Sequence, residues 1–202
     1  MVRIAAALLG AALSLSHVAS AEARVIVREK TKYYSVYGKD GRSLYASIRK
    51  RGARGAGARH AIATTRSKMD LRNVKSGVRG RNCVIKDADL VLDLTYSYPR
   101  WRNQRKASAR TRAAWSRFFA RVKRHEETHG RIAKKYAARI LREMKRQKSS
   151  VRSGCRDRNG RNARRLSRLL IGLQKEQLRF DRREARSFSR IRRLERALAT
   201  AR

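Results

Sequence analysis

Proline and cysteine are scarce in this sequence. Its 202 residues contain one proline, Pro99, and two cysteines, Cys83 and Cys155. The cysteines do not have the close CxxC spacing of structural zinc sites, so a pair of zinc-ligating thiols is the weaker interpretation of them. Beyond the first fifteen residues, no segment is long and apolar enough to cross a bilayer.

Negative charge is also in short supply, with 15 Asp and Glu against 54 Lys and Arg and a net charge of +39. Such an excess implies attraction to polyanions, but it carries no specificity. The aromatic residues are not interleaved with basic ones as a nucleic-acid stacking platform requires, so no specific nucleic-acid partner is expected. Hydrophobic residues make up 41% of the chain, enough for a core, and disorder is not predicted.

The first residues have the pattern of a secretory signal peptide. Met1-Val2-Arg3 is positively charged, Ile4 to Leu15 is apolar, and Ala19-Ser20-Ala21 is a small-x-small cleavage site. About a dozen apolar residues are too few to span a membrane. We therefore predict a signal peptide over residues 1–21 and a periplasmic or secreted protein. In an exported protein, Cys83 and Cys155 are expected to form a disulfide.

The rest, residues 22–202, is expected to form a single domain of α+β class. In its sheet-rich half, residues 22–100, strands are predicted at 25–37 and 84–96 and, more weakly, at 60–71. Ser43 can cap a short helix that buries Leu44 and Ile48. Pro99 should end the last strand. We expect a small antiparallel sheet, whose 84–96 strand could offer an exposed edge to a peptide.

The other half, residues 101–202, has helical periodicity from Ala107 almost to the end. A break is predicted at 149–160, with a second long helix beginning near Asn162. Each helix carries an apolar stripe. The stripes consist of Trp115, Phe118, Phe119, Val122, Ile132, Tyr136, Ile140 and Met144, and of Leu166, Leu169, Leu170, Leu173, Phe180, Phe188, Ile191 and Leu194.

The pentapeptide HEETH, residues 125–129, lies on the first of these helices. Four-residue spacing puts His125 and His129 on one helix face, as two ligands of a zinc ion require. Glu126 is then placed to act as a general base on a metal-activated water. After signal cleavage only His60 remains besides these two histidines, and the pair lies beside the apolar stripe. Both features argue against a chance match, while a purely structural zinc site stays an alternative.

A catalytic zinc site needs a third protein ligand. The extended HExxHxxGxxH pattern does not apply, because residue 135 is lysine. Periodicity on the second helix puts Glu184 on the apolar face between two phenylalanines, and we predict it as the third ligand. A salt bridge from Glu184 to an arginine is the alternative. Weaker candidates are Asp181, Glu176, Glu143 and His60.

A set of residues between 30 and 190 matches the pattern of a known family. The set consists of Tyr33 to Gly38, Leu44, Ile48, Cys83-Val84, Pro99, Trp101, Trp115, the HEETH motif, Cys155 and the segment from Gln177 to Ala185. In these residues the sequence resembles the predicted secreted zinc-dependent proteases of bacteria, a domain family of unknown function. The resemblance implies a zincin-like fold and a peptidase.

These observations predict a zinc-dependent peptidase with Glu126 as general base and a peptide or protein substrate, acidic if the charge selects it. A tyrosine could assist the hydrolysis, and the candidates are Tyr33, Tyr34, Tyr96 and Tyr98. The alternative is a non-catalytic, highly basic envelope protein that binds polyanions and has a structural or degenerate metal site.

Overall fold

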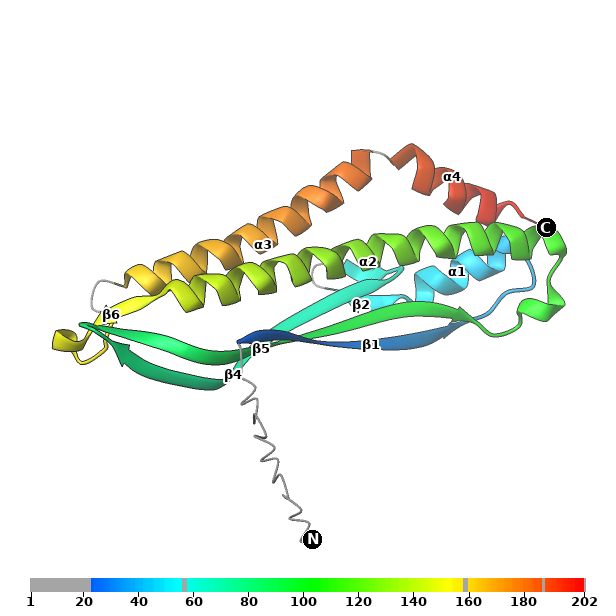
Figure 1. The fold of residues 1–202 in the computed structure, drawn as a ribbon. Helices are drawn as coiled ribbons and strands as arrows, with labels where there is room; N and C mark the ends of the chain where they lie inside the picture. The colour runs from blue at the N-terminus through cyan, green and yellow to red at the C-terminus, as the bar shows by residue number, and fades with distance from the viewer. Residues whose placement is uncertain (1–22, 56–57, 158–159, 187, 202) are drawn as a thin grey trace, which may run out of the picture.

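The computed structural model describes residues 23–55, 58–157, 160–186 and 188–201, so the predicted signal peptide lies outside the described residues. Helices stack on one face of a sheet (Figure 1). The strands are β1 (Arg24–Val36), β2 (Ala53–Gly55), β3 (Ala58–Ala61), β4 (Thr64–Arg79), β5 (Asn82–Trp101) and β6 (Lys148–Ser150). The helices are α1 (Gly41–Arg51), α2 (Ala109–Arg146), α3 (Arg161–Arg186) and α4 (Phe188–Ala199), with 3-10 turns at Gln104–Lys106 and Val151–Ser153.

The main sheet is mixed, and β5 lies in its middle. The order is β1-β5-β4, with β1 parallel and β4 antiparallel to β5, and β6 pairs with the start of β5. The α+β class is confirmed, whereas the prediction of an antiparallel sheet is wrong. Since α1, the β2–β3 hairpin and β4 separate β1 from β5, the chain has the length a parallel connection needs.

Two further predictions about this strand are wrong, because β5 is central in the sheet and longer than expected. Residues 84–96 are no free edge, because β4 pairs with them along their length and β1 with their second half. The strand also continues through Pro99 to Trp101. Pairing with β4 reaches only to Ser97, so the proline, which has no N–H to donate, lies beyond the end of that ladder.

The core forms where α2 crosses β5. Leu90, Leu92 and Leu94 alternate along the strand and pack against Ala133 and Ala137 of α2, whose small side chains let the helix approach the sheet. A second cluster joins the N-terminal part of α2 to α1 and α4, and includes Leu44, Ile48, Trp101, Trp115, Phe118 and Leu198. The predicted apolar face of the first long helix is therefore buried as expected.

The cap of α1 is Asp40, where the sequence predicts Ser43. The Asp40 carboxylate accepts from the Ser43 backbone N–H at 2.8 Å, and the Ser43 hydroxyl accepts from the Asp40 N–H at 3.4 Å. This reciprocal arrangement satisfies two otherwise unpaired N–H groups, which explains why the earlier residue is the cap. Next to it, the Gly41 N–H donates to the Ala201 carbonyl at 2.8 Å. A Cβ on Gly41 would lie 1.5 Å from the Leu198 carbonyl oxygen, so only glycine lets the end of the chain dock here.

The second helical stretch consists of two helices, α3 and α4, where the sequence predicts one. The predicted stripe residues Phe188 and Ile191 have side chains outside the described residues. In Figure 1, α3 and α4 lie over α2, on its side away from the sheet. None of the described helices combines the length and apolar character that crossing a membrane requires.

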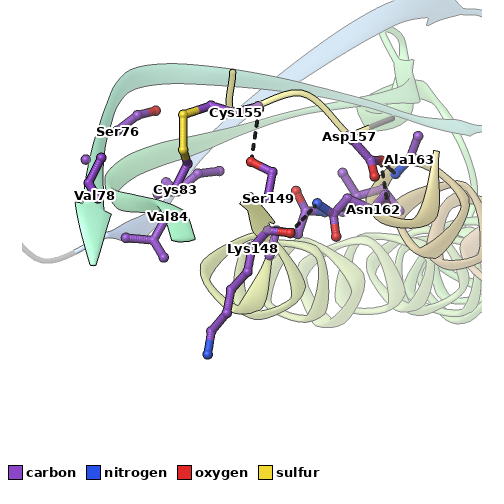
Figure 2. Close-up of a pocket in the computed structure, with 14 residues that line it drawn as sticks. Ser76, Val78, Cys83, Val84, Lys148, Ser149, Cys155, Asp157, Asn162 and Ala163 are labelled. Atoms are coloured by element: carbon purple, nitrogen blue, oxygen red, sulfur yellow. Dashed lines mark hydrogen bonds between the residues drawn. A yellow bond between two sulfur atoms is a disulfide. The ribbon is translucent and has the colours of Figure 1, made fainter. Parts of the chain in front are cut away.

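The predicted disulfide between Cys83 and Cys155 is confirmed (Figure 2). It ties the start of β5 to the connection between α2 and α3, with a Cα–Cα distance of 5.5 Å. The Ser149 hydroxyl donates to the Cys155 carbonyl at 2.9 Å, and a cavity of about 550 Å³ lies beside the bond. The disulfide thus fixes the beginning of α3 to the sheet.

Candidate metal centre

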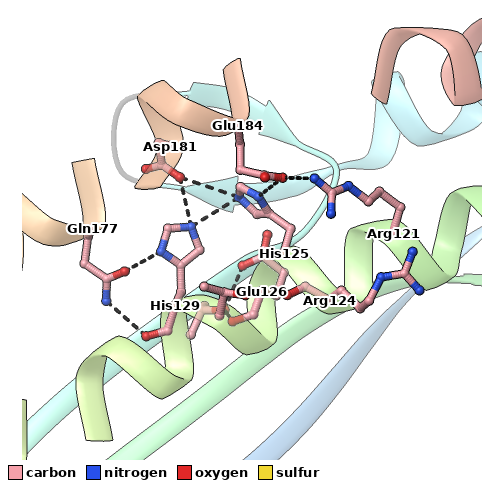
Figure 3. A network of polar contacts seen from close by, with 10 residues as sticks. Arg121, Arg124, His125, Glu126, His129, Gln177, Asp181 and Glu184 are labelled. Atoms are coloured by element: carbon pink, nitrogen blue, oxygen red, sulfur yellow. Dashed lines mark hydrogen bonds and ion pairs between the residues drawn. The ribbon is translucent and has the colours of Figure 1, made fainter. Parts of the chain in front are cut away.

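The HEETH segment lies in the middle of α2, with its two histidines turned toward α3 (Figure 3). The Nε2 atoms of His125 and His129 lie 3.2 Å apart. Glu126 points to the sheet side and is 6% exposed. The Thr65 hydroxyl of β4 contacts both the Glu126 carboxylate, at 2.7 Å, and its backbone carbonyl, at 3.0 Å. His125 and His129 therefore face α3, whereas Glu126, on the same turn of α2, faces β4.

α3 supplies a carboxylate to the two histidines. Asp181 Oδ1 lies 2.9 Å from His129 Nε2 and 3.5 Å from His125 Nε2. The three atoms form a triangle with sides of 2.9, 3.2 and 3.5 Å. In a tetrahedral zinc site with ligand distances near 2.1 Å, ligand atoms are about 3.4 Å apart. With two imidazole nitrogens and a carboxylate oxygen at this spacing, these three residues form a possible metal-binding group.

The nitrogens on the far side of the two rings also meet residues of α3. His129 Nδ1 hydrogen-bonds Gln177 Oε1, and Gln177 Nε2 donates to the His129 carbonyl at 3.1 Å. His125 Nδ1 is buried and has no hydrogen-bond partner among the described residues, and Glu184 Oε2 is 3.6 Å away. Contacts of this kind hold metal-binding imidazoles in one orientation. Phe180 lies against both rings, at centroid distances of 4.9 and 5.0 Å.

A family profile matches residues 31–188 of the chain, and its description is a bacterial protein of unknown function (DUF922). The chain belongs to the DUF922 family. No curated protein and no solved structure matches the chain. The part of the chain that carries the DUF922 match includes both histidines, Glu126 and Asp181, so the candidate centre lies within the family region.

In this DUF922 protein, not all of the residues predicted for the site lie together around the two histidines. Glu184 forms an ion pair with Arg121, as the alternative interpretation predicted, and its Oε2 lies 3.6 Å from Nδ1 of His125. Asp181, a weaker candidate, is the carboxylate next to both Nε2 atoms. The other weaker candidates lie elsewhere: Glu176 pairs with Lys135, Glu143 pairs with Arg165, and the side chain of His60 is outside the described residues.

Two cavities meet at Glu126 in the DUF922 chain. A cavity of about 410 Å³ lies between α3 and the first residues of β4, Thr64 to Ser67, and its lining includes His125, His129 and Asp181. The second, of about 240 Å³, shares Ala63, His125 and Glu126 with the first. Its other lining residues are mostly apolar: Ile62, Phe118, Arg121, Val122, Leu194 and Glu195.

The candidate tyrosines lie outside these cavity linings. Burial, followed by the charge of Glu29, raises the pKa of Tyr96 to about 12. Burial raises the pKa of Tyr98 and of Tyr34 well above the ordinary value. The Tyr96 hydroxyl lies close to Gly130, where a Cβ would be 2.0 Å away, so glycine after His129 lets the helix approach β5. Tyr96 and Tyr98 therefore stay protonated and pack between α2 and the sheet, whereas the Tyr34 hydroxyl donates to the Ile62 carbonyl at 2.7 Å.

Proposed function

We propose that this protein is a zinc-dependent peptidase whose metal ligands are His125, His129 and Asp181. The observation that carries the proposal is the triangle of their ligand atoms, with sides close to those of a tetrahedral zinc site, beside the buried Glu126. Asp181 replaces Glu184 as the proposed third ligand, because Glu184 is engaged by Arg121. Three protein ligands leave a coordination position open, as catalytic zinc sites do.

Glu126 is the proposed proton carrier. A bound zinc ion supplies Lewis acidity, which lowers the pKa of water and polarises a peptide carbonyl. The Glu126 carboxylate accepts the proton of the attacking water and passes it to the departing amine. The Thr65 hydroxyl, 2.7 Å from one carboxylate oxygen, holds the group in place and leaves the other oxygen for this transfer. Burial of Glu126 limits competing contacts with bulk water.

The substrate is proposed to lie along β4. Within the described residues, β4 pairs with β5 on one side only, and its first residues line the 410 Å³ cavity beside the metal ligands. A peptide in extended form can add to such an edge by backbone hydrogen bonds. The adjoining apolar cavity, of about 240 Å³, can take a hydrophobic side chain next to the cleaved bond. The high positive charge favours acidic residues farther along the substrate.

Export is part of the same proposal. The signal-peptide pattern of residues 1–21 directs the chain out of the cytoplasm, and the disulfide suits an oxidising compartment. We propose a periplasmic or secreted location.

The deciding experiment compares three proteins, the wild type, Glu126→Gln and Glu127→Gln, for zinc content and for hydrolysis of an unstructured protein. Glu127 is the matched control, because it is the adjacent glutamate and pairs with Lys123 at 3.7 Å. Glu126→Gln should keep about one zinc per chain and lose hydrolysis, whereas Glu127→Gln should keep both. Hydrolysis at the wild-type rate by Glu126→Gln, or no bound zinc in any of the three, would favour the alternative of a non-catalytic basic protein.

A further inference from the structure

The face of the sheet opposite the metal centre has its own polar arrangement. In the described part of the chain, no helix covers this face (Figure 1). Successive residues of a strand point to opposite faces. Since Thr65 reaches up to Glu126, its neighbours Thr64 and Arg66 face the other way. The same short stretch of β4 thus contributes to both faces.

The strand register arranges this face in rows. One row consists of Lys32 of β1, Ser97 of β5 and Thr64 of β4. The next row consists of Lys30, Thr95 and Arg66. A column of hydroxyl groups on the central strand is therefore flanked by cationic side chains from the two outer strands.

A cavity of about 210 Å³ lies over these rows, and its lining includes Lys32, Arg66, Thr64, Thr95 and Ser97. Its lining contains no acidic residue. The three hydroxyl groups have no hydrogen-bond partner among the described residues, and Lys32 has no ion pair there. The nearest carboxylate in the register, Asp93, stands one row beyond Thr95, between Arg28 and Lys68. The rest of the lining is Tyr33 and Tyr34, so the cavity presents cationic and hydroxyl-bearing side chains.

We propose that this cavity binds a tetrahedral oxyanion, a phosphate group. Hydroxyl, ammonium and guanidinium donors converge on it from three strands, and charge-assisted hydrogen bonds to oxyanions are the strong ones. An anion also relieves the repulsion between the facing cations. Along β1, Arg28, Lys30 and Lys32 follow one another at about 6.6 Å, so a chain of phosphate groups can engage several in turn. The site differs from general attraction to a basic surface, because it requires the uncharged Thr95 hydroxyl.

The test titrates the mature protein with inorganic phosphate and, separately, with linear polyphosphate at constant ionic strength, and follows amide chemical shifts by NMR. The variants are the double change Lys32→Ala and Arg66→Ala, the single change Thr95→Val, and a charge-matched control on exposed α3 residues, Arg168→Ala with Lys175→Ala. Thr95→Val keeps a β-branched side chain and the net charge, so it reports on the hydroxyl alone.

Saturable binding should change the NMR chemical shifts of the backbone amides of β1, β4 and β5 that lie near the cavity. The double variant should weaken binding about tenfold or more, Thr95→Val by several-fold, and the α3 control very little. Tighter binding of polyphosphate than of the free ion would identify a polymer as the source of the phosphate group, and the reverse would identify the free ion. Equal weakening by the two double variants, no effect of Thr95→Val, or shifts that never saturate would each overturn the proposal. Glu126→Gln should bind phosphate normally, so this result does not depend on peptidase activity.

Discussion

The two halves of the candidate metal centre are held in different ways. The half on α2 lies on a helix with a row of buried side chains, packed directly on β5. The half on α3 lies on a helix with no buried side chain among those described, and Leu170, Ile171 and Leu178 are about half exposed. Core packing positions His125 and His129, whereas Asp181 depends on polar contacts with α2 and on what holds the two ends of α3.

This difference indicates where the centre can be loosened. α3 begins next to the disulfide loop, and beyond its other end α4 docks Leu198 against α1 and α2. Between these ends, Leu166 and Leu169 give partial apolar packing against the core. Changes in the anchors should therefore alter metal affinity through α3, while the α2 half keeps its geometry.

The largest effect is expected from removing the disulfide. Replacing both Cys83 and Cys155 by serine opens a loop of 72 residues and should lower the free energy of unfolding by about 4 kcal/mol. It should also weaken zinc binding, because the start of α3 loses its covalent tie. Urea unfolding and a competitive zinc titration measure the two effects. If stability falls but zinc affinity is unchanged, the contacts between α2 and α3 alone hold Asp181 in place. The idea that the α3 half depends on the anchors at the ends of the helix would then be wrong.

The second prediction separates the two α3 carboxylates. Asp181→Asn should weaken zinc binding by about a hundredfold or more, since it removes a proposed ligand, whereas Glu184→Gln should cost about tenfold, the scale of an outer contact to a ligating histidine. Dissociation constants from competition with a chelating dye give both values. The opposite order would return Glu184 to the role that periodicity predicted for it.

The third prediction tests the α2 half. A methyl group on Gly130 would lie 2.0 Å from the Tyr96 hydroxyl, so Gly130→Ala should destabilise the fold by about 2 kcal/mol through overpacking. Adding Tyr96→Phe removes the clashing oxygen and should restore most of the loss. Thermal unfolding of the single and double variants shows this. An unaffected single variant would mean that α2 is not packed tightly against β5 beside the histidines.

Local sequence patterns predicted the parts of the fold that depend on local interactions. The apolar stripe predicted α2, and the pairing of Cys83 with Cys155 was expected from the signal-peptide pattern and the presence of two cysteines. The parallel pairing of β1 with β5 depends on contacts about 65 residues apart, for example Arg24 with Asp89 at 3.3 Å, and no local pattern encodes its direction. The separation of α3 from α4 also has no local signal, because residues 180–190 include neither proline nor glycine.

The third-ligand position shows the same limit at the site. Periodicity placed Glu184 on the face of α3 that meets α2, but Asp181 lies less than one turn from it. The choice between them as the proposed ligand depends on how α3 crosses α2 and on Arg121, which engages Glu184. One signal was available: Arg121 precedes His125 by four residues, so a cation stands one turn from the proposed metal ligands and attracts one of the two carboxylates.

The smallest effect concerns the far anchor of α3, where α4 meets α1. Hydrogen bonds from Ser43 lower the pKa of Asp40, so the ionised cap stabilises the folded state above the ordinary value of 3.8 and loses this contribution as the pH falls through the lowered pKa. Asp40→Ala should cost about 1 kcal/mol at pH 7, and the difference from wild type should shrink below about pH 4. Asp40→Asn should keep most of the cap at both pH values. Urea unfolding at pH 7 and pH 3 checks this. A cost of Asp40→Ala that is equal at the two pH values would show that the cap stabilises this anchor through its hydrogen bonds with Ser43, whether or not the carboxyl group is charged.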